Sequence, residues 1–234
     1  MNVTHDASVS AKRITKSFAE RTLWRDLSFE AAAGELTVIL GQSGSGKTTL
    51  LNCVAGIERI DSGDLVVNGV DVPHLRGSNL RRYLAETVGL LFQNYALVDT
   101  WTVGRNLAVV MTEQGAVAEN LKSEAVERFL LSPDLLSKRV YSLSGGEQQR
   151  VALARLFLKD PAVIIADEPS AALDDVNTEM LTSYLLEKCA LGATVLVSTH
   201  DPRIIRRSHS RLSLTSTSLE DLALDSASAG SSAP

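Results

Sequence analysis

Residues 36–48, Leu36-Thr37-Val38-Ile39-Leu40-Gly41-Gln42-Ser43-Gly44-Ser45-Gly46-Lys47-Thr48, pass from an apolar run directly into a glycine-rich segment. A short apolar run that ends abruptly is typical of a central strand buried on both faces. A helix is predicted to begin near Lys47 and to end at Gly56, a residue type that suits a helix C-terminus. A strand, a glycine loop and a helix in this order predict an α/β fold.

The glycine-rich segment, residues 41–48, fits the pattern G-x-x-x-x-G-K-[ST] in the strand-to-helix context that this motif requires. Glycines let successive backbone N–H groups curl around phosphate oxygens, and the helix start adds partial positive charge. Lys47 can reach the β- and γ-phosphates of a nucleotide, and the Thr48 hydroxyl can bind Mg²⁺. A glycine-rich turn without a ligand is the alternative, but the flanking elements favour nucleotide binding. The residues expected to hold the nucleotide are Gly41, Gln42, Ser43, Gly44, Ser45, Gly46, Lys47, Thr48 and Thr49.

A second apolar run, residues 163–166, ends in two carboxylates, Asp167 and Glu168. Asp167 is expected to hold Mg²⁺, usually through water, as in other phosphate-loop enzymes. Glu168 is then placed to polarise an attacking water as general base. Two solvated acids at a strand end would be the simpler interpretation in a chain without a phosphate loop. Because one chain has both features, we expect a metal-dependent hydrolytic site.

The segment Leu143-Ser144-Gly145-Gly146-Glu147-Gln148-Gln149-Arg150 begins a helix that is predicted over 145–159. Ser144 and Glu147 fit a capping box, in which each side chain binds the backbone N–H of the other residue. The capping box leaves Gly145 and Gly146 unexplained, because glycine disfavours a first helical turn. Exposed N–H groups at a helix start form an anion site. The chain therefore has two phosphate-binding helix starts, and one nucleotide uses only the first.

The rest of the chain alternates between predicted strands and helices, which is typical of a parallel α/β sheet. Strands are expected at 65–67, 88–92 and 194–198, and helices at 176–190 and within 103–140. Within the last range, apolar residues recur every four positions and are expected to form one buried face: Val117, Leu121, Ala125 and Phe129.

The chain is expected to form a single domain over residues 1–224, followed by a disordered tail at 225–234 that is rich in Ser and Ala. Within the domain, a β-rich nucleotide-binding core is expected at about 11–75 and 146–212. A helical subdomain is expected at about 76–145.

Composition limits the possible partners and locations. With 44% hydrophobic and 22% charged residues, the chain resembles a globular protein that buries a core. Its net charge of −5 argues against nucleic acid as the main partner, because phosphate backbones bind basic surfaces. Cys53 and Cys189 have no metal-ligand spacing and are expected to act as small buried apolar residues. Every apolar run is far shorter than the roughly 18 residues of a membrane span. We therefore expect a soluble, cytoplasmic protein, in which any membrane span comes from another chain.

Taken together, these motifs closely resemble the ATP-binding subunit of ABC transporters, and the resemblance covers residues 10–212. It implies a phosphate-loop NTPase core (RecA-like, with a mostly parallel sheet), a small antiparallel β subdomain and a helical subdomain. Residues 143–150 resemble the signature motif, which in this family closes over the γ-phosphate bound by the opposite subunit. The resemblance thus assigns the second anion site to a partner's nucleotide, through Ser144, Gly145, Gly146 and Glu147.

The resemblance also implies roles for residues outside these motifs. Phe18 matches the aromatic residue that stacks on adenine, although a core phenylalanine remains the alternative. Gln93 matches the glutamine that binds Mg²⁺ together with Thr48 and Asp167, senses the γ-phosphate and couples to the membrane partner. His200, in Ser198-Thr199-His200-Asp201, resembles the switch histidine, so that the implied catalytic set is Glu168, His200 and Gln93.

Two further segments bear on the resemblance. Residues 170–174, which end in Asp174, resemble the D-loop, a second segment near the nucleotide. Residues 206–211 depart from the family, which usually has a more apolar strand there. This departure leaves the last strand of the fold open.

The implied function is that of an ATPase that binds ATP and Mg²⁺ and dimerises with a second copy of itself or with a paralogous ATPase subunit. The dimer would drive an integral membrane permease from the inner face of the cell membrane, and no nucleic acid partner is expected. Residues 92–97 and 143–155 resemble the exporter subgroup that handles macrolides, lipoproteins and bacteriocins, with peptide export the nearest branch.

Two alternatives remain open at this point. One is a soluble ABC ATPase without a transporter, of the kind that acts in Fe–S assembly; the repair and translation types are disfavoured, because the chain has no coiled-coil insertion and only one cassette. The other is a phosphate-loop kinase, which would leave the helix start at 143–150 unexplained.

Overall fold

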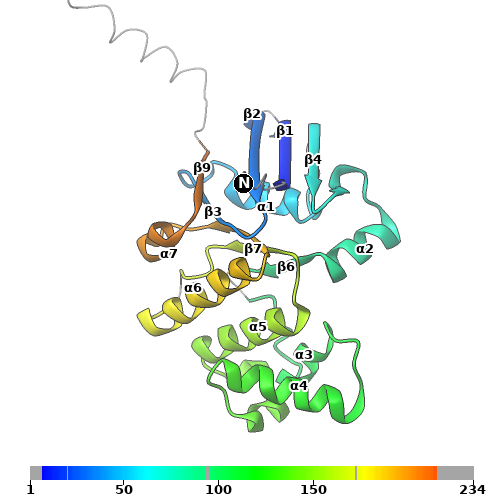
Figure 1. Cartoon of the computed structure of the whole chain (residues 1–234), viewed down its shortest axis with the longest axis vertical. Coiled ribbons are helices and arrows are strands. Elements are labelled where there is room, and N and C mark those ends of the chain that lie inside the picture. The colour runs from blue at the N-terminus through cyan, green and yellow to red at the C-terminus, as the bar shows by residue number, and fades with distance from the viewer. Residues whose placement is uncertain (1–6, 20, 93–94, 172, 215–234) are drawn as a thin grey trace, which may run out of the picture.

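The computed structural model describes residues 7–19, 21–92, 95–171 and 173–214. Along the long axis, an antiparallel sheet is followed by a parallel sheet with its helices and then by a group of helices (Figure 1). This arrangement confirms the expected α/β class, including its antiparallel and helical parts. The tail predicted at 225–234 lies outside the described residues. Within the described ranges, no helix combines the length and the apolar character that a membrane crossing needs.

The parallel sheet has five strands in the order β6-β7-β8-β3-β9. Successive side chains of a strand point to opposite faces. Accordingly, Ile164 and Val195 join one buried cluster, whereas their neighbours Ile165 and Leu196 join another. Both faces are therefore covered, which explains why successive positions in the middle of the inner strands are apolar, as in Ile164-Ile165 and Val195-Leu196. In sheet order, the strands are Val88–Leu91, Val163–Asp167, Thr194–Ser198, Leu36–Leu40 and Ser210–Ser213.

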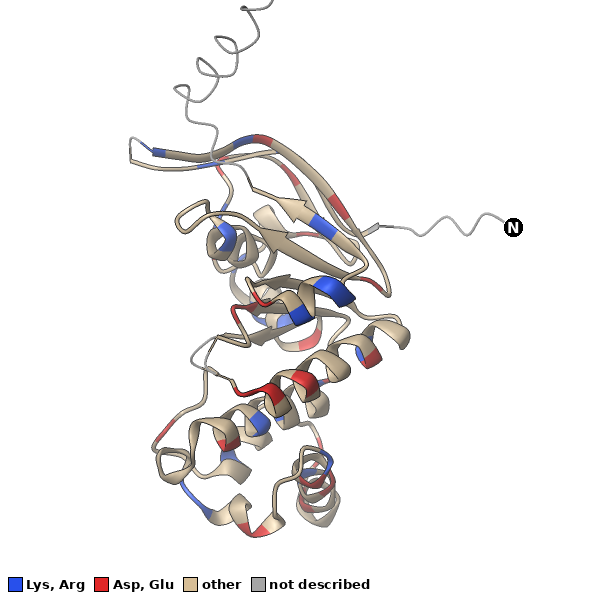
Figure 2. Cartoon of the chain, turned by 90° about the vertical axis from the view of Figure 1, so that its left-hand side faces the viewer, with Lys and Arg blue, Asp and Glu red and all other residues tan. Residues whose placement is uncertain are grey.

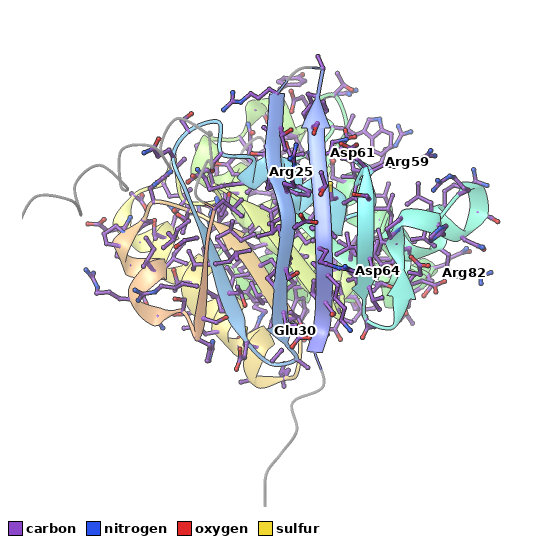
Figure 3. All side chains as sticks on the ribbon, turned by 90° about the horizontal axis from the view of Figure 1, so that it is seen from above. Arg25, Glu30, Arg59, Asp61, Asp64 and Arg82 are labelled. Carbon is purple, nitrogen blue, oxygen red and sulfur yellow. The ribbon has the colours of Figure 1, made fainter. Side chains whose placement is uncertain are left out.

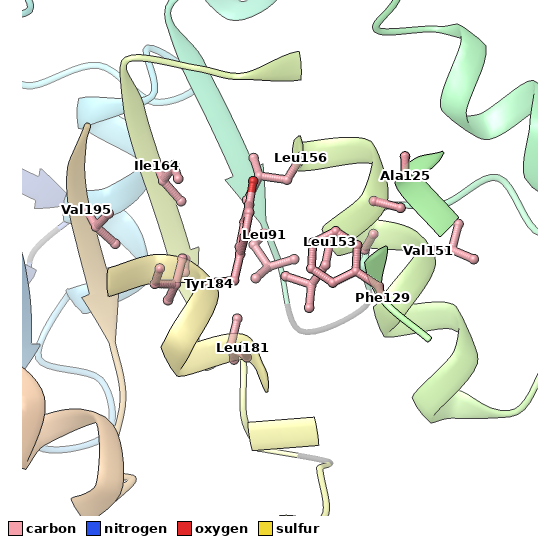
Figure 4. Close-up of a cluster of buried hydrophobic side chains, with 14 of the residues drawn as sticks. Leu91, Ala125, Phe129, Val151, Leu153, Leu156, Ile164, Leu181, Tyr184 and Val195 are labelled. Atoms are coloured by element: carbon pink, nitrogen blue, oxygen red, sulfur yellow. The ribbon is translucent and has the colours of Figure 1, made fainter. Parts of the chain in front are cut away.

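Helices cover the two faces of this sheet. Helix α1 (Lys47–Val54) packs on one face through residues such as Leu50 and Leu51. Helices α5 (Gly145–Lys159) and α6 (Asp175–Ala190) pack on the other, in the cluster shown in Figure 4. There the rings of Phe129 and Tyr184 meet edge to face, with centroids 5.3 Å apart. This packing places the starts of α1 and α6 at the carboxyl edge of the sheet.

The two cysteines lie in these helices, Cys53 in α1 and Cys189 in α6. Both thiols are free and buried. Burial raises the pKa of each thiol to about 12, so that neither forms a reactive thiolate near neutral pH. The prediction that both act as small apolar residues is confirmed.

The last strand, which the sequence left open, does form. Strand β9 pairs in parallel with β3, from Thr37 with Ser210 to Leu40 with Ser213. It lies at the edge of the sheet, where its residues alternate between half-buried and exposed, so that a polar sequence suffices. His209, just before β9, is exposed at the surface and also binds β3: its Nδ1 accepts from the N–H of Leu36 at 2.9 Å.

The helices at the far end are α3 (Val103–Ala108) and α4 (Gly115–Arg128). The apolar face expected along this region is only partly present, because Ala125 and Phe129 are buried but Val117 is 59% exposed. A spacing of four residues drifts around a helix by about 40° per step, so that the start of the series turns away from the core. The prediction for Val117 was therefore wrong. The short 3₁₀ turns η2 (Pro133–Ser137) and η3 (Val140–Ser142) lead from α4 to α5.

Residues 76–145, expected as a helical subdomain, also contain β6, which pairs with β7 in the parallel sheet. They contain α2 (Gly77–Glu86) as well, which packs against α1: the Tyr83 hydroxyl donates to the Val54 carbonyl at 2.6 Å. The start of this range thus packs with the nucleotide-binding core.

The antiparallel sheet has the strand order β2-β1-β4-β5. Its inner face packs on α1, and in β4 the inward Leu65 and Val67 are buried whereas Asp64 is exposed. The opposite face carries charged side chains, among them Arg25 and Asp64 (Figure 3). The four strands are Arg21–Ala32, Ala7–Phe18, Ser62–Val67 and Val70–Asp71, with the 3₁₀ turn η1 (Val72–His74) after the last.

Candidate active site

The loop between β3 and α1 is a tight turn that requires glycine. Gly46 is the N-cap of α1 and has a left-handed φ of 93°. A Cβ at this position would lie 2.9 Å from Nε1 of Trp24 and 3.2 Å from Cδ1 of Leu23. Inside the turn, the N–H of Ser45 donates to the carbonyl of Gln42 at 3.1 Å. The sequence pattern of glycines thus corresponds to a close approach of the loop backbone to the antiparallel sheet.

The first turn of α1 leaves its donors free for a ligand. Helix α1 has no side-chain cap and no acidic residue in its first turn, so that its N–H groups and its partial positive charge face the loop. Among the described residues, the buried hydroxyl of Ser45 finds no hydrogen-bond partner. Ser45 does not line the cavity beside the loop, so the donors that face a ligand are the backbone N–H groups at the start of α1.

Lys47 bends back across the loop that precedes it. Its Nζ donates to the carbonyl of Gly41 at 2.7 Å and to that of Gln42 at 3.3 Å. The same atom lies 3.4 Å from Nε2 of His200. The ammonium group therefore stands between the phosphate loop and the end of β8, where it can pair with phosphate oxygens.

The acidic pair lies at the end of β7, and Ser198 at the end of β8 holds it in place. The Ser198 hydroxyl donates to Oδ1 of Asp167. The N–H of Glu168 donates to the Ser198 carbonyl at 2.9 Å, and its φ of 44° is unusual for a residue other than glycine. Such backbone strain is found at functional sites, where the surroundings hold it. No sequence motif pointed to this role of Ser198, although it lies only two residues before His200.

Glu168 and His200 face each other across the site. Oε1 of Glu168 lies 3.6 Å from Nε2 of His200. Their side chains are 28% and 64% exposed, so that both remain accessible to a water molecule and a ligand. A carboxylate at this place can accept a proton from water, and the imidazole can donate a hydrogen bond to a nearby oxygen.

One cavity of about 590 Å³ brings most of the predicted site residues together. Arg21 is an addition, because no sequence motif pointed to it; its Nη2 donates to the carbonyl of Gly44 at 3.0 Å. Gln93 lies outside the described residues. The cavity is lined by Phe18, Arg21, Leu23, Ser43, Gly44, Gly46, Lys47, Thr48, Thr49, Asp167, Glu168 and His200.

Phe18 lies on the rim of this cavity and not in the core. Its side chain is 48% exposed, and Nζ of Lys16 lies 4.5 Å from the centre of its ring. Lys16 is itself held by Glu58, whose Oε1 lies 2.8 Å from Nζ, and this hydrogen bond lowers the pKa of Glu58. The alternative of a core phenylalanine is excluded, and the exposed face of the ring is available for stacking on a base.

The glycine pair at 145–146 starts α5 and does not line this cavity. The capping box is present: the N–H of Ser144 donates to Oε2 of Glu147 at 2.8 Å, and the N–H of Glu147 donates to Oγ of Ser144 at 3.3 Å. The first of these bonds lowers the pKa of Glu147. A Cβ on Gly145 would meet nothing within 4 Å. The described part of the chain therefore gives no packing reason for a glycine at this position.

Asp174 also lies away from the cavity, at the N-cap of α6. Its Oδ1 accepts from both the backbone N–H and the side-chain amide of Asn177, each at 2.8 Å. Oδ1 of Asn177 in turn accepts from Nη1 of Arg150 at 2.8 Å. Asp174 thus joins the start of α6 to the helix that begins at Ser144.

The donor set of the cavity fits ATP and Mg²⁺. The phosphate loop offers N–H groups and the Lys47 ammonium, and the Thr48 hydroxyl and Asp167 carboxylate are hard oxygen donors. The described residues contain no group of three or more His, Cys, Asp or Glu side chains that would form a complete metal cage. Mg²⁺ keeps water and phosphate ligands, so that few protein oxygens are needed to hold it, and when bound it would neutralise charge on the phosphates.

Comparison with known sequences supports this interpretation. A family model described as "ABC transporter" matches residues 24–171. The ABC transporter ATP-binding protein YxdL of Bacillus subtilis is 37% identical over 202 residues, which cover 83% of this chain and 78% of that protein. The lipoprotein-releasing system ATP-binding protein LolD of Porphyromonas gingivalis is 34% identical, covering 84% of this chain and 91% of that protein. The methionine import ATP-binding protein MetN of Clostridium acetobutylicum is 33% identical, covering 88% of this chain and 65% of that protein.

Solved structures give the same answer for the fold. The dimeric structure of MJ0796, an ABC transporter cassette, superposes with a TM-score of 0.81 at 27% identity, covering 88% of this chain and 94% of that chain. A post-hydrolysis structure of MJ0796 bound to ADP and Pi superposes with a TM-score of 0.80. The chain belongs to the ABC transporter family, in which it is an ATP-binding subunit with ATPase activity.

Proposed function

We propose that two copies of this chain, or this chain and a paralogous ATPase subunit, enclose two Mg·ATP at their interface and hydrolyse them. The observation that carries the proposal is the position of Gly145 and Gly146. They begin a helix outside the cavity that holds Lys47 and Glu168, and a side chain on Gly145 would meet open space. A glycine without an internal reason at an anion-binding helix start is explained by the phosphate of a second subunit. The similarity to the dimeric MJ0796 cassette supports the same arrangement.

Within this arrangement, each site residue has a defined task. Phe18 stacks on adenine; residues 41–49 and Lys47 hold the phosphates; Thr48, Asp167 and Gln93 serve Mg²⁺. Glu168 accepts the proton of the attacking water, and His200, 3.6 Å away, orients Glu168 and the γ-phosphate oxygens. From the partner, the start of α5 and Asp174 complete the enclosure.

Glu168→Gln tests the role of the base. The amide keeps the size of the side chain but cannot take up a proton, so that hydrolysis should fall by at least about a hundredfold. ATP-dependent dimerisation, followed by size-exclusion chromatography with Mg·ATP, should persist. Glu30→Gln, on the exposed face of the antiparallel sheet, is the control and should retain full activity. Unchanged hydrolysis in Glu168→Gln would remove Glu168 from the role of base.

The membrane partner is proposed to dock in a groove lined by residues of β6 and α5 and by the residues that follow α3. Apolar side chains dominate this groove, and Arg155 and Lys159 are its cations. Arg155 holds the adjoining chain in place, donating to the carbonyl of Tyr95 at 2.8 Å. The occupant that fits is a cytoplasmic helix of the permease with apolar and acidic side chains. The groove has a volume of about 190 Å³ and is lined by Leu90, Phe92, Ala96, Val109, Val110, Arg155, Leu156 and Lys159.

Val109→Asp tests this docking site, because Val109 is 58% exposed in the groove. A carboxylate there should abolish co-purification with the permease from detergent-solubilised membranes and leave the ATPase rate of the isolated chain unchanged. The matched control is Val117→Asp, on α4 and 59% exposed, which should co-purify normally. A purely soluble complex in the unmodified protein would instead support an ATPase of the Fe–S assembly type.

We further propose that the chain is peripheral on the inner face of the cell membrane and powers export of a peptide, lipoprotein or drug-like substrate. The basis is the resemblance of residues 92–97 and 143–155 to the exporter subgroup, with LolD covered over 91% of its length and MetN over 65%. Nucleic acid is not the proposed partner, since basic and acidic residues are interspersed over the elements seen in Figure 2. Uptake by inverted membrane vesicles that contain the permease would establish the direction.

A further inference from the structure

Arg203 lies in the first turn of α7 (Pro202–Arg207), three residues after His200. Its guanidinium binds two carboxylates on different elements. Nε donates to Oδ1 of Asp201 at 2.9 Å and Nη2 donates to Oδ2 of the same residue at 2.6 Å. Nη1 donates to Oδ1 of Asp175, at the start of α6. One side chain therefore bridges the segment of His200 and the helix that follows Asp174.

The bond between Arg203 and Asp201 is the stronger of the two. The Asp201 side chain is only 10% exposed, and the hydrogen bonds from Arg203 lower its pKa. A forked pair of this kind fixes both distance and orientation. Asp175 is 97% exposed, so that its ion pair with Arg203 helps to orient the guanidinium but adds little to the stability of the fold.

The backbone on the other side of His200 is held as well. Oγ1 of Thr199 accepts from the N–H of Asp201 at 3.0 Å, and it lies 3.5 Å from Oγ of Ser170. Thr199 and Ser170 are both buried. The residues before and after His200 are thus tied to the loop that leads to Asp174, and the imidazole is the part left exposed.

Asp174, the residue before Asp175, links the start of α6 to α5: it binds Asn177, and Asn177 binds Arg150 on α5. A continuous set of contacts therefore runs from the segment of His200, through Arg203 and the start of α6, to α5. In the proposed dimer, its two ends serve different nucleotides.

We propose that Arg203 is a positioning residue. By binding both Asp201 and Asp175, it couples the position of His200 in the chain's own ATP site to the position of the start of α6. This inference rests on the proposed role of His200 in hydrolysis. Rigid support of this kind matters because catalytic groups act only within a narrow range of positions.

The chain provides a matched control on the same pair of helices. Arg207 in α7 binds Oε1 of Glu179 in α6 at 2.5 Å, and its hydrogen bond and ion pair among the described residues are with Glu179 and not with residues 199–201. Arg207→Gln removes one ion pair between α7 and α6 and leaves the segment of His200 untouched. It therefore distinguishes the effect of losing an ion pair between α7 and α6 from the effect of moving His200.

The first measurement is the histidine ring NMR spectrum of the full chain, with His200→Ala used to assign the His200 signal. Arg203→Gln should shift or broaden this signal, whereas Arg207→Gln should leave it unchanged. Arg203→Lys keeps the charge but cannot form the fork, and it should behave like Arg203→Gln if positioning is the cause. A His200 signal that is unchanged in Arg203→Gln, or equally changed in Arg207→Gln, would overturn the proposal.

The second measurement is the steady-state ATPase rate of the same variants. Arg203→Gln should lower kcat by about tenfold with little change in KM, and Asp175→Asn should lower it by roughly twofold. In the His200→Ala background, Arg203→Gln should have no further effect; an equal reduction in both backgrounds would contradict the proposal. If the NMR signal moves and His200→Ala leaves hydrolysis unchanged, positioning by Arg203 stands and the proposed role of His200 fails.

Discussion

The helices α1 and α5 both begin at glycine-containing segments, yet their first turns are completed in opposite ways. Helix α1 starts at Gly46, with a left-handed φ of 93° and no side-chain cap. Helix α5 starts at Ser144, which forms a capping box with Glu147. The first leaves its N–H groups free beside Lys47, and we propose it as the phosphate site made by the single chain. The second is already satisfied internally by a carboxylate, and only the N–H groups next to Gly145 remain for a ligand.

The difference between the two starts shows how one chain can contribute to two sites. In the proposed dimer, a glycine that the fold requires, such as Gly46, serves the chain's own nucleotide. A glycine that the fold does not require, such as Gly145, serves a ligand held by the partner subunit. Substitutions at these two positions should therefore have different consequences for stability, nucleotide binding and hydrolysis.

The largest effect is expected from Gly46→Ala. The left-handed φ disfavours any side chain by about 1–3 kcal/mol, and the new Cβ would lie 2.9 Å from Trp24 Nε1. Distortion of the loop should weaken ATP binding, measured by isothermal titration calorimetry, by about a hundredfold. The control is Gly69→Ala, which has a φ of 76° but open space around it. It should cost stability in urea unfolding and retain ATP affinity; equal loss of affinity in both variants would contradict the assignment.

Gly145→Ala should have a smaller effect, confined to the assembled state. A Cβ there meets nothing within 4 Å in the chain, so that stability and ATP binding by the isolated subunit should be unchanged. ATP-dependent dimerisation and hydrolysis should fall by about tenfold, because the methyl group would intrude on the partner's γ-phosphate. Full ATPase activity at saturating protein concentration would show that no second nucleotide approaches α5.

The smallest effect concerns the capping box at low pH. The hydrogen bond from the N–H of Ser144 lowers the pKa of Glu147 below its ordinary value of 4.5. A carboxylate with a lowered pKa in the folded state stabilises the fold above its ordinary pKa, and this stability is lost as the pH falls through the lowered value. Glu147→Gln should therefore lose part of the acid dependence of unfolding, by about 0.5 kcal/mol or less after solvent screening. If the free energy of unfolding in urea changed equally with pH in Glu147→Gln and in the unmodified protein between pH 7 and pH 3, a role of the ionised carboxylate would be ruled out.

Local sequence was enough to predict the elements that carry chemistry. The phosphate loop at 41–48, the strand ending in Asp167 and the helix starting after Ser144 each depend on short-range rules of turns, burial and capping. Residues that act through long-range contacts were not predictable in this way. Ser198, which binds Asp167, and Arg21, which binds Gly44, belong to no motif, and only folding brings them to the site.

The α/β class, the limits of the apolar strands and the capping box of α5 could all be predicted from sequence, because these features depend on residues that are close together along the chain. The exposure of Phe18, the formation of β9 at the sheet edge and the exposure of Val117 became clear only from the folded chain. These outcomes depend on which distant surfaces cover a residue. The same holds for the two helix starts: the sequence contains both, but packing alone shows that the first requires its glycine and the second does not.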